Sequence, residues 1–260
     1  MSEAETMTKK LIQTPHIVAH IDFLGASKKM LTPGESNDFL QKINCIYSTV
    51  LQKKNLSIQC GLSNLKVRIF SDNIVIAKKI RASQYPLNEF ISVQAFAQML
   101  QAYAFSQGEL VPGAITKGDF FINDTFVYGE ALCKAYRMET NFAKHPRIII
   151  DPCIFPNGIL PHISTGVHGT RMNLIIRDKD GMYYLNIFNF MEKYFSQDEF
   201  KEILPKIKEA IVHGYSDSFN ANEAVLSKYI WLAEKFNEFY DACNLQEHKI
   251  LMSIHEVSHE

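Results

Sequence analysis

Two aspartates, Asp22 and Asp72, occupy positions from which they can hold a divalent cation. Asp22 lies near the end of an apolar run at residues 16–25 that is typical of a buried strand. Asp72 is the central residue of a polar turn, 71–73, between two segments in which apolar and polar residues alternate. Carboxylates delivered in this way can converge on a pair of cations, and Mg²⁺ prefers one or two carboxylates plus substrate phosphates. Each aspartate alone is better explained as an ordinary turn or capping residue.

The turn after Asp22 supplies groups that suit a triphosphate. Its backbone N–H groups can form a cradle for the β- and γ-phosphates, and Gly25 lets the main chain approach closely. We therefore predict nucleotide binding by the residues that follow Phe23, which are Leu24, Gly25, Ala26 and Ser27.

These residues need a scaffold that brings distant segments together. The hydrophobic spacing predicts the order of a ferredoxin-like α+β sheet, rich in antiparallel strands and with helices on one face. Ser36 or Asn37 is available as the N-cap of the first helix. The predicted elements are a strand at 16–25, a helix at 36–51, a hairpin at 66–79, a helix at 88–105, a strand at 111–122, a helix at 129–143 and a strand at 147–150.

The pattern changes after Asp151, where a stretch rich in proline and glycine begins. A hairpin is predicted around residues 179–181, followed by amphipathic helices at 198–213 and 218–243. We divide the chain into a flexible N-terminus (1–14), a catalytic domain (15–150) and a C-terminal extension (151–260) packed on the same core.

Composition excludes several classes of function. The 260 residues are 47% hydrophobic, which is enough for a sizeable core, and the 27 basic and 28 acidic residues nearly cancel. No sequence-wide positive field is present to attract a nucleic acid or an anionic membrane. The five cysteines form no Cys-x-x-Cys pair, and no apolar run is long enough to span a bilayer. We expect a soluble cytoplasmic protein.

A third polar element spans residues 127–139 and reads VYGEALCKAYRME. Together with residues 21–27 and 68–73, it resembles the three successive motifs of the class III nucleotidyl cyclases, over roughly residues 15–150. More narrowly, the first two motifs, the strand at 113–115 and the helix at 228–232 resemble the bacterial pyrimidine cyclases of the Pycsar anti-phage system.

This resemblance implies a two-metal mechanism. Asp22, Asp72 and the Phe23 carbonyl would bind two divalent cations, Mg²⁺ or Mn²⁺, and Arg137 would stabilise the transition state. A guanidinium suits that role because it stays charged and can fork onto phosphate oxygens. In the family this arginine acts across a dimer interface, so the resemblance implies a head-to-tail homodimer with two composite active sites.

The resemblance also bears on the base. Cys133 stands where purine cyclases carry an asparagine, Arg68 where adenylyl cyclases carry a base-reading lysine, and Phe126 where they carry a base-reading aspartate. An arginine can donate two hydrogen bonds to a pyrimidine edge, and bulky Phe126 or Tyr128 can shrink the base pocket. UTP or CTP is therefore the expected substrate.

The expected products are pyrophosphate and cyclic UMP or cyclic CMP, so the enzyme would be a lyase, a uridylate or cytidylate cyclase. The cyclic nucleotide would be a second messenger in antiviral defence, sensed by a separate effector protein. Three alternatives stay open: an adenylate cyclase, a catalytically inactive cyclase-like module that binds a nucleotide, and another two-metal enzyme such as a dinucleotide cyclase or a polymerase relative.

Overall fold

The computed structural model describes residues 10–56, 64–81, 85–158, 160, 164–167, 170–219, 222–243 and 248–251. Most of the predicted flexible N-terminus, residues 1–9, lies outside this part of the chain. None of the described helices combines the length and the apolar character needed to cross a membrane.

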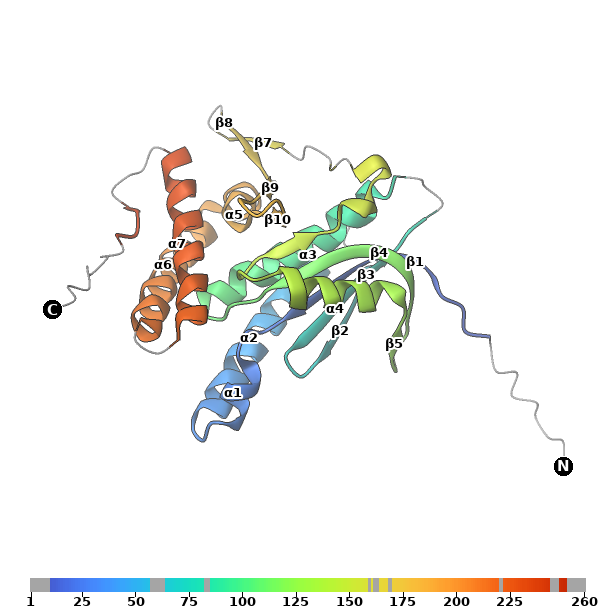
Figure 1. The fold of residues 1–260 in the computed structure, drawn as a ribbon, viewed down its shortest axis with the longest axis horizontal. Helices are drawn as coiled ribbons and strands as arrows, with labels where there is room; N and C mark the ends of the chain where they lie inside the picture. Colours follow the sequence, from blue (N-terminus) through green and yellow to red (C-terminus); the bar gives the residue numbers. More distant parts are fainter. Residues whose placement is uncertain are drawn as a thin grey trace.

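The structure is built around an open β-sheet. Its strands follow the order β2-β3-β1-β4-β6-β10-β9, and β5 pairs with β4 (Figure 1). All neighbours are antiparallel except β4 and β6. The first four strands have the ferredoxin-like order, because β1 lies between β3 and β4. The predicted α+β class with an antiparallel-rich sheet is confirmed. The bounds are β1 Thr14–Asp22, β2 Lys66–Phe70, β3 Asn73–Lys79, β4 Gly113–Ile122, β5 Val127–Tyr128, β6 Ile148–Ile150, β9 Ile175–Arg177 and β10 Tyr183–Leu185.

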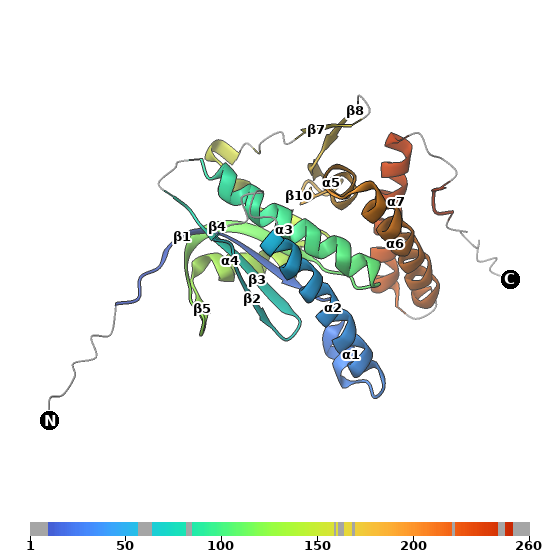
Figure 2. The ribbon, with the colours of Figure 1, turned by 180° about the vertical axis from the view of Figure 1, so that it is seen from behind.

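Helices cover both faces of this sheet, so the prediction of helices on one face was wrong. Ile17, Ala19 and Ile21 of β1 point into the main core beneath α2 (Glu35–Leu56) and α3 (Leu87–Ser106). Val18 points the other way, into a smaller cluster that includes Ala131 of α4 (Glu130–Phe142). Figure 1 shows α4 in front of the sheet, and Figure 2 shows α2 and α3 over the opposite face.

The short strand β5, which the sequence prediction lacked, explains the position of α4. It folds back on β4 and delivers Gly129 against that strand. Gly129 has a φ of 144°, and a Cβ there would lie 2.4 Å from the Asp119 carbonyl oxygen. Gly118 of β4 likewise lies against Ala131, where an added Cβ would be 3.3 Å from the Ala131 nitrogen. The two glycines therefore let α4 pack directly on the sheet.

Other elements also differ from the prediction. α2 begins at Glu35, whose N–H donates to the Thr32 carbonyl, so Ser36 and Asn37 lie inside the helix and neither is its N-cap. The predicted hairpins at 66–79 and around 179–181 are confirmed. Besides β5, the helices and strands that were not predicted are α1 (Ala26–Leu31), the strands β7 (Ser164–Val167) and β8 (Thr170–Asn173), and α5 (Ile187–Tyr194).

The C-terminal part of the chain extends the same sheet and core. β10 pairs with β6, and β9 pairs with β10. α6 (Gln197–Ser218) and α7 (Glu223–Ala242) pack on each other, and α6 packs against α3. One hydrophobic cluster contains both Phe96 of α3 and Phe236 of α7.

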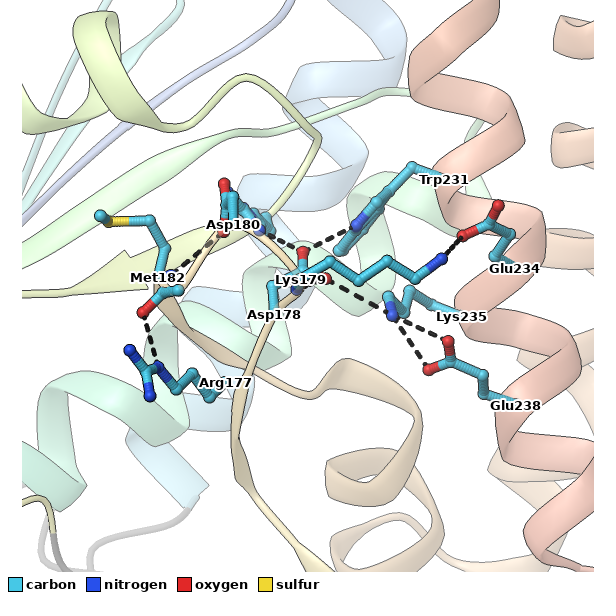
Figure 3. A network of polar contacts seen from close by, with 11 residues as sticks. Arg177, Asp178, Lys179, Asp180, Met182, Trp231, Glu234, Lys235 and Glu238 are labelled. Carbon is cyan, nitrogen blue, oxygen red and sulfur yellow. Dashed lines mark hydrogen bonds and ion pairs between the residues drawn. The ribbon is translucent and has the colours of Figure 1, made fainter.

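A buried ionic network joins these parts at the β9–β10 turn (Figure 3). The Arg147 guanidinium, 0% exposed, pairs with both Asp178 and Asp180. Asp178 also accepts the Trp231 indole N–H at 2.9 Å and lies 3.6 Å from the Lys235 ammonium. Burial acts to raise the pKa of Asp178, but the Lys179 backbone N–H, the Trp231 indole and the nearby positive charges outweigh burial and hold the pKa below its usual range.

We predict that Asp178→Asn lowers the free energy of unfolding by about 3 kcal/mol, because it leaves buried Arg147 without its main counter-charge. Since the pKa of Asp178 is lowered by folding, its contribution is present above about pH 4 and is lost as the pH falls through the folded-state pKa. Urea unfolding at several pH values measures both effects.

The matched control is Glu234→Gln, because Glu234 forms an exposed ion pair with Lys179 at 3.1 Å in the same region. Its replacement should leave the free energy of unfolding nearly unchanged. Equal effects of the two substitutions would show that the buried network has no special role in stability.

Candidate active site

The candidate site lies at the end of β1, where two carboxyl groups meet. Asp22 is the last residue of β1 and pairs across the sheet with Asn73, the first residue of β3. Asp72 precedes Asn73 in the tight turn after β2, in which Ser71 has a left-handed φ of 57°. The register of the hairpin therefore brings Asp72 beside Asp22.

The two carboxyl groups interact strongly. Burial, the charges of Asp72 and Glu139, and a side-chain hydrogen bond with Asp72 raise the pKa of Asp22 to about 6, against a smaller opposite effect of the Phe23 backbone. Like charges held together in a half-buried place disfavour the ionised form. A cation between the carboxylates would reverse this effect.

The Asp22 side chain has the features of an incomplete cation site. Its Oδ1 atom is buried and has no hydrogen-bond partner among the described residues, and an unsatisfied buried acceptor is costly. The described part of the chain contains no cluster of three or more His, Cys, Asp or Glu side chains suited to a metal. The protein thus offers two carboxylates, which fits Mg²⁺ or Mn²⁺ completed by water and phosphate oxygens.

Phe23 contributes a buried ring and a main-chain carbonyl oxygen, which is a type of atom that binds cations. Its side chain, 1% exposed, packs edge-on against Phe39 and Tyr47 at centroid distances of 6.0 Å. Its carbonyl accepts the Ala26 N–H at 3.2 Å, and a carbonyl oxygen has a second lone pair for a cation. The predicted role of Phe23 as a main-chain ligand is compatible with this geometry.

The predicted phosphate cradle is reduced in the structure. The Leu24 N–H donates to the Leu110 carbonyl at 2.9 Å, and the Ala26 N–H donates to Phe23. The first bond joins the turn to the segment that precedes β4, and the second belongs to the turn that leads into α1, residues 26–31. Gly25 caps this helix with a φ of 72°, a conformation that favours glycine. The backbone N–H groups of Gly25 and Ser27 stay the candidates for phosphate binding.

Two further residues approach the carboxylates, and the sequence analysis gave neither a role. Glu139 of α4 raises the pKa of Asp22, and burial raises the pKa of Glu139 itself. The Tyr47 hydroxyl of α2 is buried without a hydrogen-bond partner among the described residues. Its pKa is raised by burial and then by the charges of Asp72 and Asp22. In the sequence, Glu139 could have been singled out because it lies two residues after Arg137. Tyr47 looked like an ordinary core residue.

Arg137 and Cys133 are not brought to the carboxylates of their own chain. Both are exposed and lie four residues apart on the solvent side of α4. Ala131 and Ala135, in contrast, face the sheet and are buried. Among the residues that the structure describes, no ion pair or hydrogen bond of the Arg137 side chain is formed.

The predicted base-reading residues form a separate group near the β4–β5 turn. Arg68 donates from Nε to the Asn123 carbonyl at 2.8 Å and pairs with the Asp124 carboxylate. Phe126, 44% exposed, lies against Phe121 with ring centroids 5.2 Å apart. The exposed Tyr128 follows in β5. Several Arg68 donors are thus engaged within the protein, which leaves fewer for a base than the sequence suggested.

Comparison with known proteins gives only distant similarities. No protein-family model matches the sequence, and no curated protein matches it. The adenylyl cyclase CyaB from P. aeruginosa aligns with a TM-score of 0.43 and 13% identity, over 56% of this chain and 81% of that one. A bacterial light-regulated adenylyl cyclase aligns with a TM-score of 0.41 and 11% identity, over 78% of this chain and 59% of that one.

The catalytic core of a rhodopsin-guanylyl cyclase with converted specificity, in complex with ATPαS, aligns with a TM-score of 0.43 and 12% identity. The alignment covers 68% of this chain and 97% of that one. This chain spans less than two thirds of the length of the light-regulated cyclase. Since all three scores lie below 0.5, the description of the fold rests on the strand order and register given above.

We predict that Asp72→Asn raises the thermal midpoint of the metal-free protein, because it removes a charge that opposes ionisation of Asp22. Mn²⁺ at about ten times its dissociation constant should raise the midpoint of the unaltered protein by about 2–4 °C and leave that of the variant unchanged. Differential scanning fluorimetry with and without Mn²⁺ measures this.

The control is Asp198→Asn at the exposed start of α6, which should keep the full response to Mn²⁺. An Asp72→Asn protein that responds to Mn²⁺ like the unaltered one would exclude Asp72 as a ligand.

Proposed function

We propose that the protein is a nucleotidyl cyclase that forms a 3′,5′-cyclic nucleotide and pyrophosphate from a nucleoside triphosphate. The observation that carries the proposal is the buried, unsatisfied Oδ1 of Asp22 beside a second carboxylate, Asp72. The order of the three sequence motifs supports the same activity. In this proposal Asp22, Asp72 and the Phe23 carbonyl hold two divalent cations.

The reaction is an in-line displacement at the α-phosphorus. The ribose 3′-oxygen forms a new bond to that phosphorus, the bond to the β-phosphate oxygen breaks, and the 3′-hydroxyl proton passes to solvent. Bound cations supply charge neutralisation for the attacking and leaving oxygens. The backbone N–H groups of Gly25 and Ser27 orient the β- and γ-phosphates.

Arg137 neutralises the charge that builds on the phosphates during this displacement. Its exposed position on α4 supports action on a nucleotide held by a second copy of the chain. A head-to-tail homodimer would then contain two composite sites, each with cations on one protomer and Arg137 from its partner. This is the symmetric closed arrangement in which each copy both gives and receives a catalytic group.

For the base, we propose a pyrimidine, UTP or CTP. Asp124 holds the Arg68 guanidinium in place, and a fixed guanidinium with donors remaining can meet a pyrimidine carbonyl. The aromatic side chains of Phe126 and Tyr128 lie in the next few residues and reduce the room for a larger base. A cyclic pyrimidine nucleotide would act on a separate effector protein, as in the anti-phage systems that the sequence resembles.

We predict that the purified protein with Mn²⁺ or Mg²⁺ converts UTP or CTP to a cyclic nucleotide and pyrophosphate faster than ATP or GTP. Incubation with each of the four ribonucleoside triphosphates, followed by mass spectrometry of the products, tests this. Asp72→Ala should reduce turnover by about 100-fold or more, because charge compensation at the reacting phosphates is lost.

Equal or faster turnover of ATP would exclude the pyrimidine preference and support an adenylate cyclase. A linear or cyclic dinucleotide product would instead identify another two-metal enzyme. Nucleotide binding that is indifferent to metal, with no pyrophosphate released, would support the inactive binding module and contradict the proposed reaction.

A further inference from the structure

A buried carboxylate, Glu109, pairs with the segment that follows Asp22. Glu109 has a side chain that is 2% exposed and pairs with two lysines from different helices. Its Oε2 pairs with Lys29 of α1, and its Oε1 lies 3.4 Å from the Lys42 ammonium of α2. Lysines that are 31% and 45% exposed thus converge on one buried acid.

Glu109 belongs to the α3–β4 connector, residues 107–112, which touches the candidate site at two more points. The Leu110 carbonyl accepts the Leu24 N–H at 2.9 Å, and the Pro112 carbonyl accepts the Asp22 N–H at 3.1 Å. Three successive contacts, one ionic and two through the backbone, therefore fix the segment 22–29 that contains Asp22 and the start of α1.

The connector is also in contact with the C-terminal helices. Gly108 packs against Ala210 of α6, and Leu110 lines the same apolar seam as Tyr229 of α7. The charge of Glu109 raises the pKa of Tyr229, after the larger effect of burial. Figure 2 shows α6 and α7 against the end of α3, where the connector begins.

We propose that Glu109 is a positioning residue for nucleotide binding. By anchoring α1 through Lys29, it keeps Gly25 and Ser27 in the orientation that receives the phosphates and keeps Asp22 facing Asp72. α6 and α7 hold Glu109 in register with this segment, which gives the C-terminal part of the chain a role in the site. The inference rests on the proposed function for its kinetic part only.

A second role of the Glu109–Lys29 ion pair predicts the opposite effect on nucleotide binding. If Lys29 itself bound phosphate, Glu109 would compete for that lysine and removal of the carboxylate would strengthen nucleotide binding. If Glu109 positions α1, its removal and that of Lys29 weaken nucleotide binding in the same direction. The signs of the two effects therefore separate the two roles.

The test uses the full chain in five variants: Glu109→Gln, Glu109→Asp, Lys29→Gln, Lys42→Gln and Glu199→Gln. Glu199 is the matched control, because it pairs with Lys53 of α2 at 2.6 Å and with Tyr103 of α3, and both partners lie outside the segment 22–29. Hydrogen–deuterium exchange of residues 22–31 is measured without nucleotide, and kcat and KM are measured with the best triphosphate.

We expect Glu109→Gln and Lys29→Gln to speed exchange in residues 22–31 by about tenfold and to raise KM by about tenfold or more, since a small misplacement of binding groups is costly. Glu109→Asp should restore part of the loss. Lys42→Gln, which removes the contact to α2 only, should have a smaller effect, and Glu199→Gln should have none on this segment.

Unchanged exchange in Glu109→Gln, or a fall in KM for Glu109→Gln with a rise for Lys29→Gln, would overturn the proposal. If Glu109→Gln does not fold, hydrogen–deuterium exchange in Lys29→Gln decides, because Lys29 is partly exposed and its loss leaves Lys42 to pair with Glu109. Faster exchange in residues 22–31 then supports the proposal, and unchanged exchange overturns it. If the unaltered protein turns over no triphosphate, the proposed function fails, and the exchange data still decide whether Glu109 holds the segment.

Discussion

The antiparallel pairing of β1 with β3 forces two carboxyl groups into a space that favours only one negative charge. Asp22 lies opposite Asn73, so Asp72 in the preceding turn cannot move away without loss of the register. Burial and this neighbour raise the pKa of Asp22 to about 6. Such a repulsion at a strand end lowers stability, and a loss of stability of this kind is common at active sites.

The remaining architecture can be understood as support for this pair. α2 and α3 bury the other side of β1, α4 brings Glu139 toward Asp22, and the α3–β4 connector bonds to the backbone on both sides of Phe23. The C-terminal helices hold that connector, and the Arg147–Asp178 network joins β6 to the β9–β10 turn. Mutations remote from the carboxylates can therefore alter the site through packing.

The sequence predicted those parts of the structure that depend on local patterns. The alternation around residues 71–73 was sufficient for the hairpin and for the tip position of Asp72, and helical spacing was sufficient for α3 and α4. The face on which α4 packs could not be predicted, because it depends on a two-residue strand, β5, and on close contacts at Gly118 and Gly129. α1 was missed because six residues carry too little periodicity.

At the candidate site, the sequence showed which residue types are present, but it did not show which contacts they make. Asp22 and Asp72 were proposed from their positions at strand ends, but the engagement of Arg68 by Asn123 and Asp124 joins segments that are far apart in the sequence. Likewise, Glu109 gave no signal in the sequence, because a single glutamate after a helix looks like any solvated residue until two lysines are folded onto it.

The proposed reaction requires a site shared between two copies of the chain. Asp72→Ala and Arg137→Ala should each be inactive alone, whereas a mixed dimer of the two retains one intact site of two. Because half of the dimers in an equal, freely exchanging mixture are mixed, the mixture should recover about a quarter of the activity of the unaltered protein. A mixture that stays as inactive as its components, with exchange of subunits demonstrated, would contradict the composite site.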